Sequence, residues 1–411
     1  MLFTLSLCLF LGLTKAWTPE SRAIEKENKL AVRWLEGSRK FRGVNLGSQF
    51  IIERWMAEDE WKTMGCGSTN DEWACAKAIG QDAADTAFTK HWASWTTKSD
   101  ISQIASLGLN TVRIPVGFWI RESLIEEGEY YPRGGLKYLD RVVGWCKEAG
   151  LYVIIDLHGA PGSQTTNEQF TGHSVATPGF YTAENYERAY KFLEWMTNRI
   201  HTNGNYTTVG MLQVLNEPVH TGPWKAEAAD MIETFYPGAY QRIRDAESKL
   251  GIAKADLLHI QYMENTQGKA WGSGDPRTNL TNTNYTYYDA HRYYSFDKTV
   301  PNTKKGYINA ACSDNVGANN LLVGEWSLSV NSSVRTSEEF EIHNRPDQIE
   351  WYSQYWAAQA QAFERAGGWV FWAWKCNWIN GIDEWRWCYK SAVAAGVIPR
   401  DAGTANSTSP C

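Results

Sequence analysis

The sequence predicts an α/β protein with a single (β/α)8 barrel, or TIM barrel. Apolar segments with strand character alternate with amphipathic helical segments, and most of the apolar segments end in polar or charged residues. Parallel strands that close into a barrel bring their carboxyl ends to one rim, where such barrels carry their functional residues. A length of 411 residues accommodates one barrel better than two unrelated domains.

Eight segments have the character of barrel strands. The clearest is 211–218, in which the largely apolar run Met-Leu-Gln-Val-Leu is followed by Asn216, Glu217 and Pro218. Proline disfavours helical geometry at the residue before it and cannot donate to a sheet, so we expect this strand to end here. The other predicted strands are 41–47, 110–115, 151–159, 257–263, 287–294, 321–326 and 369–375.

Helical periodicity and one long loop complete the predicted barrel. The segment 48–100 is rich in Trp, and we expect it to fold over the rim as a cap with short helices, because structureless loops of this length are uncommon in compact domains. Apolar residues recur at the helical period in several segments between the strands. The predicted helices are 101–109, 136–150, 184–201, 226–250 (interrupted near Pro237) and 349–366.

The first 16 residues have the pattern of a secretory signal peptide. Residues 1–16 combine a short apolar stretch with the small-x-small sequence Thr14-Lys15-Ala16, although no Lys or Arg precedes the apolar part. We assign 17–40 to a polar N-terminal extension and 41–411 to the barrel domain. No second long apolar segment is present and the C-terminus is polar, so we expect a secreted, extracellular protein without a membrane anchor.

Closely spaced cysteine pairs and Asn-x-Ser/Thr sequences are consistent with secretion. Removing Cys8 with the signal leaves seven of the eight cysteines, and two pairs are close enough in sequence to form disulfides in an oxidising compartment: Cys66 with Cys75, and Cys376 with Cys388. Cys146 lies in a helical pattern and is expected to be a buried free thiol, whereas the pairing of Cys312 and Cys411 is open. Candidate glycosylation sites are Asn205, Asn279, Asn284, Asn331 and Asn406.

Composition narrows the functional classes. The net charge is -6 and no basic run is present, which argues against a nucleic-acid partner. The 21 Trp and 20 Tyr residues are unusually many, and flat apolar rings with a polar handle suit stacking on sugar rings. The sequence has no His pair at helical spacing and no Cys-x-x-Cys, so neither a metal nor another cofactor is expected.

Two of the predicted strands carry a glutamate at their end: Glu217 in Asn-Glu-Pro and Glu325 in Gly-Glu-Trp. A glycosidic bond breaks through an oxocarbenium-like transition state, which needs a proton on the leaving oxygen and a nucleophile or negative charge at the anomeric carbon. Two carboxylates across a barrel mouth supply both, so the pair predicts glycoside hydrolysis. A single glutamate at a strand end is more often a solvated rim residue, and the prediction therefore depends on both.

The polar residues at the strand ends together resemble glycoside hydrolase family 5, a cellulase-like family of retaining (β/α)8 enzymes. The likeness extends from about 41 to 375 and rests on Arg113 in Val-Arg-Ile-Pro-Val, His158 in Asp-Leu-His-Gly, Asn216-Glu217-Pro218, His291-x-Tyr293, Glu325, and the strand with Trp372 and Trp374. Within the family, the sequences at 42–47 and 158–164 resemble the fungal exo-1,3-β-glucanase and endo-1,6-β-glucanase branches, and the second more closely.

The resemblance implies roles for these residues. Glu217 is expected to be the general acid/base, with its neutral form favoured until the leaving group departs, and Glu325 the nucleophile, with the carboxyl groups about 5–5.5 Å apart. A positive charge nearby lowers the pKa of a carboxylate, so Arg113 is expected to keep Glu325 ionised. Asn216 is expected to hold the sugar 2-hydroxyl. Further supporting or substrate-binding roles are expected for His158, His291, Tyr293, Glu53 and Trp374, which alternates onto the same face as Trp372.

Linkage specificity depends on the loops. Exo-1,3-glucanases typically continue the 158–164 sequence with Asn-Gly-x-Asp-Asn-Ser-Gly, which Thr-Thr-Asn-Glu-Gln-Phe-Thr-Gly replaces at 165–172, and the loss of that Asp favours a more open cleft. The resemblance therefore implies a monomeric retaining endo-1,6-β-glucanase that acts on the β-glucan of fungal cell walls. The alternatives are an exo-1,3-β-glucanase of the same family and a catalytically silent glucan-binding barrel. A silent barrel would be expected to lack one carboxylate or its supporting residues.

Overall fold

The computed structural model describes residues 39–220, 222–266, 274–317, 320–343, 345–377 and 384–411. The predicted signal peptide and nearly all of the predicted extension lie outside the described residues. Among the residues described, no helix combines the length and the apolar composition needed to cross a membrane.

Eight parallel strands close into a barrel in sequence order, as predicted. The first strand pairs with both the second and the eighth, which closes the sheet. The strands are β1 Phe41–Asn45, β2 Thr111–Gly117, β3 Tyr152–Gly159, β4 Val209–Gln213, β5 His259–Thr266, β6 Thr286–Arg292, β7 Leu321–Trp326 and β8 Gly368–Phe371.

The strands change from apolar to polar along their inner face. Inside the barrel, Ile154 of β3 belongs to a small apolar cluster that also includes Met211 of β4 and Leu322 of β7. Successive side chains of a strand point to opposite faces, so Asp156 and His158 follow Ile154 on the same face. Both are buried. The carboxyl ends of the strands thus deliver polar groups to one rim.

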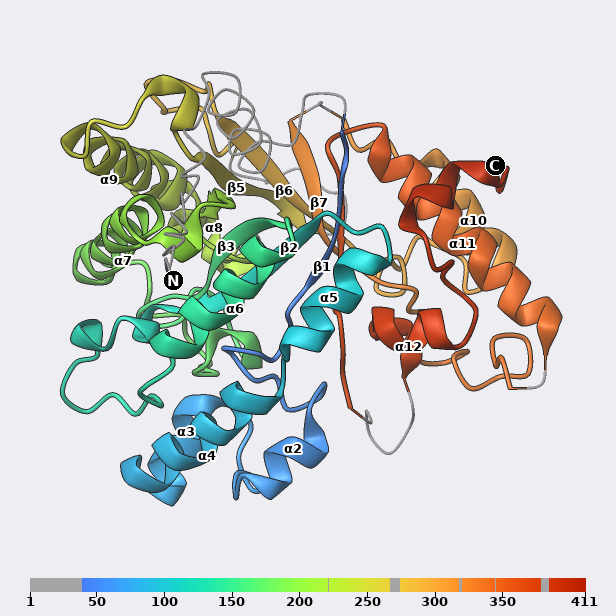
Figure 1. The fold of residues 1–411 in the computed structure, drawn as a ribbon, viewed down its shortest axis with the longest axis horizontal. Helices are drawn as coiled ribbons and strands as arrows, with labels where there is room; N and C mark the ends of the chain where they lie inside the picture. Colours follow the sequence, from blue (N-terminus) through green and yellow to red (C-terminus); the bar gives the residue numbers. More distant parts are fainter. Residues whose placement is uncertain (1–38, 221, 267–273, 318–319, 344, 378–383) are drawn as a thin grey trace, which may run out of the picture.

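Helices surround the barrel (Figure 1). The segment predicted as one helix interrupted near Pro237 forms α8, a π-helical turn at Met231–Phe235 and α9, which has proline in its first turn, where no N–H donor is needed. The helices are α2 Glu58–Thr63, α3 Glu72–Ile79, α4 Gln81–Ser94, α5 Lys98–Ser106, α6 Leu136–Glu148, α7 Ala183–Thr202, α8 Lys225–Asp230, α9 Tyr236–Lys249, α10 Lys304–Ser313, α11 Pro346–Glu364 and α12 Tyr389–Ala394.

Several element bounds differ from the prediction. Helix α10 was not predicted, because only Gly306, Tyr307 and Ala311 of it are buried and its apolar period is short. Strand β4 ends at Gln213 and β8 at Phe371, earlier than the apolar sequence suggested. The residues that follow continue on the rim as loops.

The loop after β1 forms the predicted cap. Helices α2, α3 and α4 lie together beyond the end of β1 (Figure 1), and the Cys66–Cys75 disulfide joins this segment internally. The predicted Cys376–Cys388 disulfide and the buried free thiol of Cys146 are confirmed. The pairing that the sequence left open is Cys312–Cys411, which fastens the C-terminus to the end of α10.

Candidate active site

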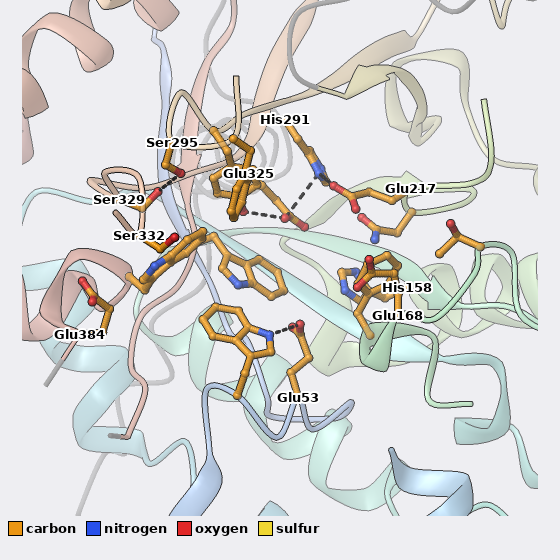
Figure 2. A pocket seen from close by; sticks show the side chains of 18 of the residues that line it. Glu53, His158, Glu168, Glu217, His291, Ser295, Glu325, Ser329, Ser332 and Glu384 are labelled. Carbon is orange, nitrogen blue, oxygen red and sulfur yellow. Dashed lines mark hydrogen bonds and ion pairs between the residues drawn. The ribbon is translucent and has the colours of Figure 1, made fainter. Parts of the chain in front are cut away.

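The two predicted glutamates lie on the same rim of the barrel. Glu325 is in β7, and Glu217 follows the end of β4. A carboxylate oxygen of one lies within 4.8 Å of a carboxylate oxygen of the other. Both line a cavity of about 630 Å³ (Figure 2), which is within the range of about 300–1,000 Å³ typical of small-ligand pockets.

Arg113 of β2 is fully buried beneath the cavity. Its Nη1 donates to Oε1 of Glu325 at 2.9 Å, and its Nη2 donates to Oδ1 of Asn216 at 2.8 Å. Nη2 also lies 3.0 Å from Oδ2 of Asp156. The planar guanidinium of Arg113 therefore fixes the carboxylate of Glu325 and the side chain of Asn216, which precedes Glu217, relative to each other.

The backbone around Glu217 is held in an unusual conformation. Glu217 has φ +34°, in the left-handed region that non-glycine residues rarely adopt. Gln164 holds the segment on both sides: its Nε2 donates to the carbonyl of Asn216 at 2.9 Å, and its own carbonyl accepts from the N–H of Val219 at 3.1 Å. Sparsely populated backbone conformations persist where the surroundings determine them, and they cluster at active sites. Gln164 is therefore a positioning residue that the sequence analysis did not identify.

His291 and Tyr293 follow each other on the inner face of β6 and the loop after it. The imidazole Nδ1 of His291 is hydrogen-bonded to Glu217 and lies 3.4 Å from Oε2 of Glu325, so the ring stands between the two carboxylates (Figure 2). Tyr293 donates its hydroxyl to Oε2 of Glu325 at 2.9 Å. The two oxygens of Glu325 are thus held separately, one by Arg113 and the other by Tyr293.

The pKa shifts of Glu217 and Glu325 differ in direction from the expectation. Burial opposes the charged form of His291, but neighbouring carboxylates, above all Glu325 and Asp289, raise its pKa to about 10. Burial favours neutral Glu217, yet the charge and hydrogen bond of His291 outweigh it and lower the pKa of Glu217. Burial raises the pKa of Glu325, and His291 and Arg113 offset this only in part. The pKa of Glu217 is therefore lowered and that of Glu325 raised, which is the reverse of the expected order.

Three other predicted residues line the cavity. Nδ1 of His158 is 2.7 Å from Oδ2 of Asp156, and the ring stacks on Trp372 with centroids 5.5 Å apart. Glu53 accepts a hydrogen bond from Nε1 of Trp55 at 2.7 Å, and burial raises its pKa to about 8. Asn216 completes the set.

Trp374 is the predicted site residue that the structure places elsewhere. It does not line the cavity, and its Nε1 donates to Oδ1 of the buried Asp100 at 3.1 Å. Trp372 lines the cavity instead. The expectation assumed strand alternation through both residues, but β8 ends at Phe371, so the alternation does not extend to them.

Three buried polar residues that were not assigned in the sequence analysis support the site: Asn45, Gln213 and Asp289. Arg113 donates to Oδ1 of Asn45 and to Oε1 of Gln213, both at 2.9 Å. Gln213 donates to Asp289 at 2.7 Å, and Asp289 is 3.2 Å from Nε2 of His291. A signal was present, because Asp289 and His291 are two residues apart and so share a face of one strand.

One group of the described residues has the donor set of a metal site: Glu217, His291 and Glu325, with ligand atoms within 4.8 Å of one another. Arg113 and His291 already place positive charge against these carboxylates.

A sequence model of the cellulase family (glycosyl hydrolase family 5) matches residues 76–377, well over half of the chain. The chain belongs to glycoside hydrolase family 5. It is therefore a glycoside hydrolase, as the paired glutamates predicted.

Curated relatives resemble almost the entire chain. Glucan endo-1,6-beta-glucosidase B of Emericella nidulans is 48% identical over 381 residues, which cover 92% of this chain and 90% of that protein. Probable glucan endo-1,6-beta-glucosidase B of Neosartorya fischeri is 46% identical over 393 residues (95% and 94%). Probable glucan 1,3-beta-glucosidase A of the same organism is 28% identical over 428 residues (96% and 94%).

Solved structures with much lower identity share the fold. Rutinosidase from Aspergillus niger matches with a TM-score of 0.66 at 19% identity, covering 88% of this chain and 98% of that chain. At this identity the likeness shows the barrel fold alone.

Proposed function

We propose that this family 5 enzyme is a secreted β-glucanase that cleaves β-1,6-linked glucan internally, by a retaining double displacement. The observation that carries the mechanism is the approach of the Glu217 and Glu325 carboxylates to within 4.8 Å. Retaining enzymes hold their two carboxyl groups about 5–5.5 Å apart, whereas inverting enzymes separate them by about 6.5–9.5 Å to admit a water. The linkage is supported by the names of relatives at 46–48% identity.

The first chemical step forms a covalent glycosyl-enzyme. Glu325 attacks the anomeric carbon, while Glu217 donates its proton to the glycosidic oxygen and the leaving sugar departs. Arg113 and Tyr293 stabilise the carboxylate form of Glu325 before the attack by donating hydrogen bonds to its two oxygens. In the second step Glu217 takes a proton from water, which attacks the same carbon and releases Glu325.

The proton on Glu217 has to be supplied before the first step. Protonated His291 is hydrogen-bonded to Glu217 and favours the carboxylate form of that residue. A sugar bound over Glu217 removes water and places an oxygen at the glycosidic position, which favours the neutral acid. We therefore assign His291 as a positioning residue that holds Glu217 until substrate binds. Asn216, fixed by Arg113, is assigned to the 2-hydroxyl of the sugar.

Two alternatives remain open to experiment. An exo-1,3-β-glucanase is supported by the 28% identity to a probable glucan 1,3-beta-glucosidase, which is well below the 48% of the endo-1,6 relative. A silent glucan-binding barrel is disfavoured because both carboxylates and their Arg113, Tyr293 and Asn216 neighbours are present and in contact.

Product analysis on two polymers tests the proposal. Linear β-1,6-glucan and β-1,3-glucan are incubated side by side, and the products are sized, with Glu325→Gln as the control. Oligosaccharides released from the 1,6-polymer alone, and absent with the variant, support the proposal. Glucose released mainly from the 1,3-polymer would assign the enzyme to the exo branch, and no release from either would favour a binding protein.

Azide rescue tests the two assigned roles separately. With an activated aryl glycoside, Glu325→Ala plus azide is expected to give the α-glycosyl azide, because azide replaces the missing nucleophile in one displacement. Glu217→Ala plus azide is expected to give the β-glycosyl azide, because azide intercepts the glycosyl-enzyme. The opposite anomers would exchange the roles, and inverted product from the intact enzyme would contradict retention.

Secretion and monomeric state belong to the same proposal. Secretion is supported by the apolar N-terminal segment with its cleavage pattern and by the glycosylation sequences. N-terminal sequencing of protein collected from the culture medium of a eukaryotic host is expected to begin after Ala16, and light scattering is expected to give the mass of one chain. An uncleaved, cell-retained protein would contradict secretion.

A further inference from the structure

Glu168 carries a carboxylate in the cavity that the mechanism above does not use. It lies in the loop after β3 and lines the cavity with Thr165 and Phe170. In the part of the chain that the structure describes, the Glu168 carboxylate has no hydrogen-bond or ion-pair partner. The other lining glutamates each have one: Glu53 with Trp55, Glu217 with His291, Glu325 with Arg113, and Glu384 with Arg386.

The loop that carries Glu168 is anchored on both sides. The N–H of Asn167 donates to the carbonyl of Val175 at 2.7 Å, which closes the loop on itself. The carbonyl of Gly172 accepts from the N–H of Trp73 in α3 at 2.9 Å, and Trp73 stacks on His173 with centroids 4.2 Å apart. The cap therefore holds this loop in place.

Glu168 lies on the acid/base side of the cavity. Figure 2 shows Glu168 and Glu217 on one side, whereas Ser329, Ser332 and Glu384 lie on the other. Glu168 is exposed to the open side of the cavity, so water solvates its carboxylate there. Partial loss of hydration and the nearby charge of Glu217 still raise its pKa to about 7. The general acid protonates the glycosidic oxygen, so the leaving sugar occupies the side of Glu217. Glu168 is therefore placed to meet that sugar rather than the one attacked by Glu325.

The chemistry of the leaving sugar distinguishes the two linkages. In a 1,6-linked glucan the leaving unit is joined through O6, so its 2-, 3- and 4-hydroxyls are free and adjacent to one another. In a 1,3-linked glucan the leaving unit is joined through O3, so no two free ring hydroxyls between C2 and C4 are adjacent. The two oxygens of a carboxylate accept hydrogen bonds from two neighbouring hydroxyls at once.

We propose that Glu168 determines linkage specificity by binding two adjacent hydroxyls of the leaving glucosyl unit, which a 1,6-linked glucan presents and a 1,3-linked glucan does not. This inference rests on the proposed function, because it concerns the leaving-sugar subsite of the same reaction. A site that hydrogen-bonds a substrate hydroxyl discriminates strongly against substrates that lack it, since its polar group is then left unpaired.

Comparison of two substrates in Glu168→Ala and Glu168→Gln tests this assignment. The first substrate is a β-1,6-linked gluco-oligosaccharide, and the second is an aryl β-glycoside whose leaving group has no hydroxyl pair. In an assay above about pH 7, where Glu168 is ionised, loss of the hydrogen bonds to this charged group is expected to lower kcat/KM on the oligosaccharide about tenfold to hundredfold in Glu168→Ala. We expect kcat/KM on the aryl glycoside to stay within about twofold.

The matched control is Glu127→Gln, an exposed glutamate in the loop before α6 that does not line the cavity. It is expected to leave both substrates unaffected. Equal losses on both substrates in Glu168→Ala would overturn the proposal, because the residue would then act on the chemistry of Glu217. Unchanged kinetics on both would overturn it as well. If the intact enzyme does not hydrolyse β-1,6-glucan at all, the proposed function itself fails, which this comparison reveals before any variant is measured.

Discussion

The substitution Tyr293→Phe removes one hydroxyl and so measures how much that hydroxyl contributes to the proposed nucleophile, Glu325. The hydroxyl donates to Oε2 of Glu325 at 2.9 Å, and the ring is packed against Trp387 with centroids 5.2 Å apart. Phenylalanine preserves the ring contacts and removes only the donor. Burial and the charge of Glu325 raise the pKa of Tyr293 well above its usual value, so the phenol is a proton donor throughout any practical assay range.

The expected loss follows from the charge of the acceptor. A hydrogen bond to a charged group contributes about 1.5–3 kcal/mol, which corresponds to about a tenfold to hundredfold change in rate. The lost donor favoured the ionised form of Glu325, so its removal raises the pKa of Glu325. Since the nucleophile must be ionised, the acidic limb of the kcat/KM profile is expected to move to higher pH.

Steady-state kinetics on an aryl β-glycoside across the pH range provide the assay. The control is Tyr294→Phe, which removes the hydroxyl of the next residue. That hydroxyl donates to Oδ2 of Asp314 at 2.7 Å, and Tyr294 does not line the cavity. We expect Tyr294→Phe to change thermal stability and leave the acidic limb in place. A Tyr293→Phe enzyme with kcat/KM within about threefold of the parent and an unshifted acidic limb would refute the reasoning.

Three further predictions concern stability and modification. The Cys312–Cys411 disulfide spans 99 residues, so Cys312→Ser with Cys411→Ser is expected to lower the unfolding free energy by about 2–4 kcal/mol in chemical denaturation, and an unchanged denaturation midpoint would contradict this. Burial raises the pKa of Glu72 from 4.5 to about 8, so the contribution of neutral Glu72 to the free energy of unfolding is complete below pH 4.5 and is lost as the pH rises toward 8. The unfolding free energy should therefore fall between pH 5 and pH 8 in chemical denaturation. Glu72→Gln should remove up to about 4 kcal/mol of this fall. Asn331 is half-buried in the cavity wall, so glycopeptide mapping should find it unmodified. A glycan at Asn331 in active enzyme would disprove this, whereas sugar is expected at the exposed Asn205, Asn279, Asn284 and Asn406.

Much of the site could be predicted because its information is local. Strand alternation, a proline after Glu217 and the even spacing of His291 and Tyr293 are properties of short segments, and each places a side chain on a known face of one element. Because all strands of a closed parallel barrel end at the same rim, side chains predicted at the strand ends come together there.

Errors arose where a local pattern was extended beyond its element. Trp374 follows the end of β8, so the alternation that assigned it to the cavity does not apply. Gln164 was overlooked because its role depends on the loop after β4, which lies far from it in the sequence and close to it in space.

The sequence by itself predicted the barrel, its polar rim and the positions of Glu217 and Glu325 on that rim, because each depends on periodicity and on residue type within a few positions. Only the tertiary structure decided how those groups influence one another. The position of His291 beside Glu217 lowers the pKa of that residue, burial raises the pKa of Glu325, and the cap holds Glu168 on the same side of the cavity as Glu217. These properties depend on distances and burial among residues from different strands and loops, and such distances are established only when the barrel closes.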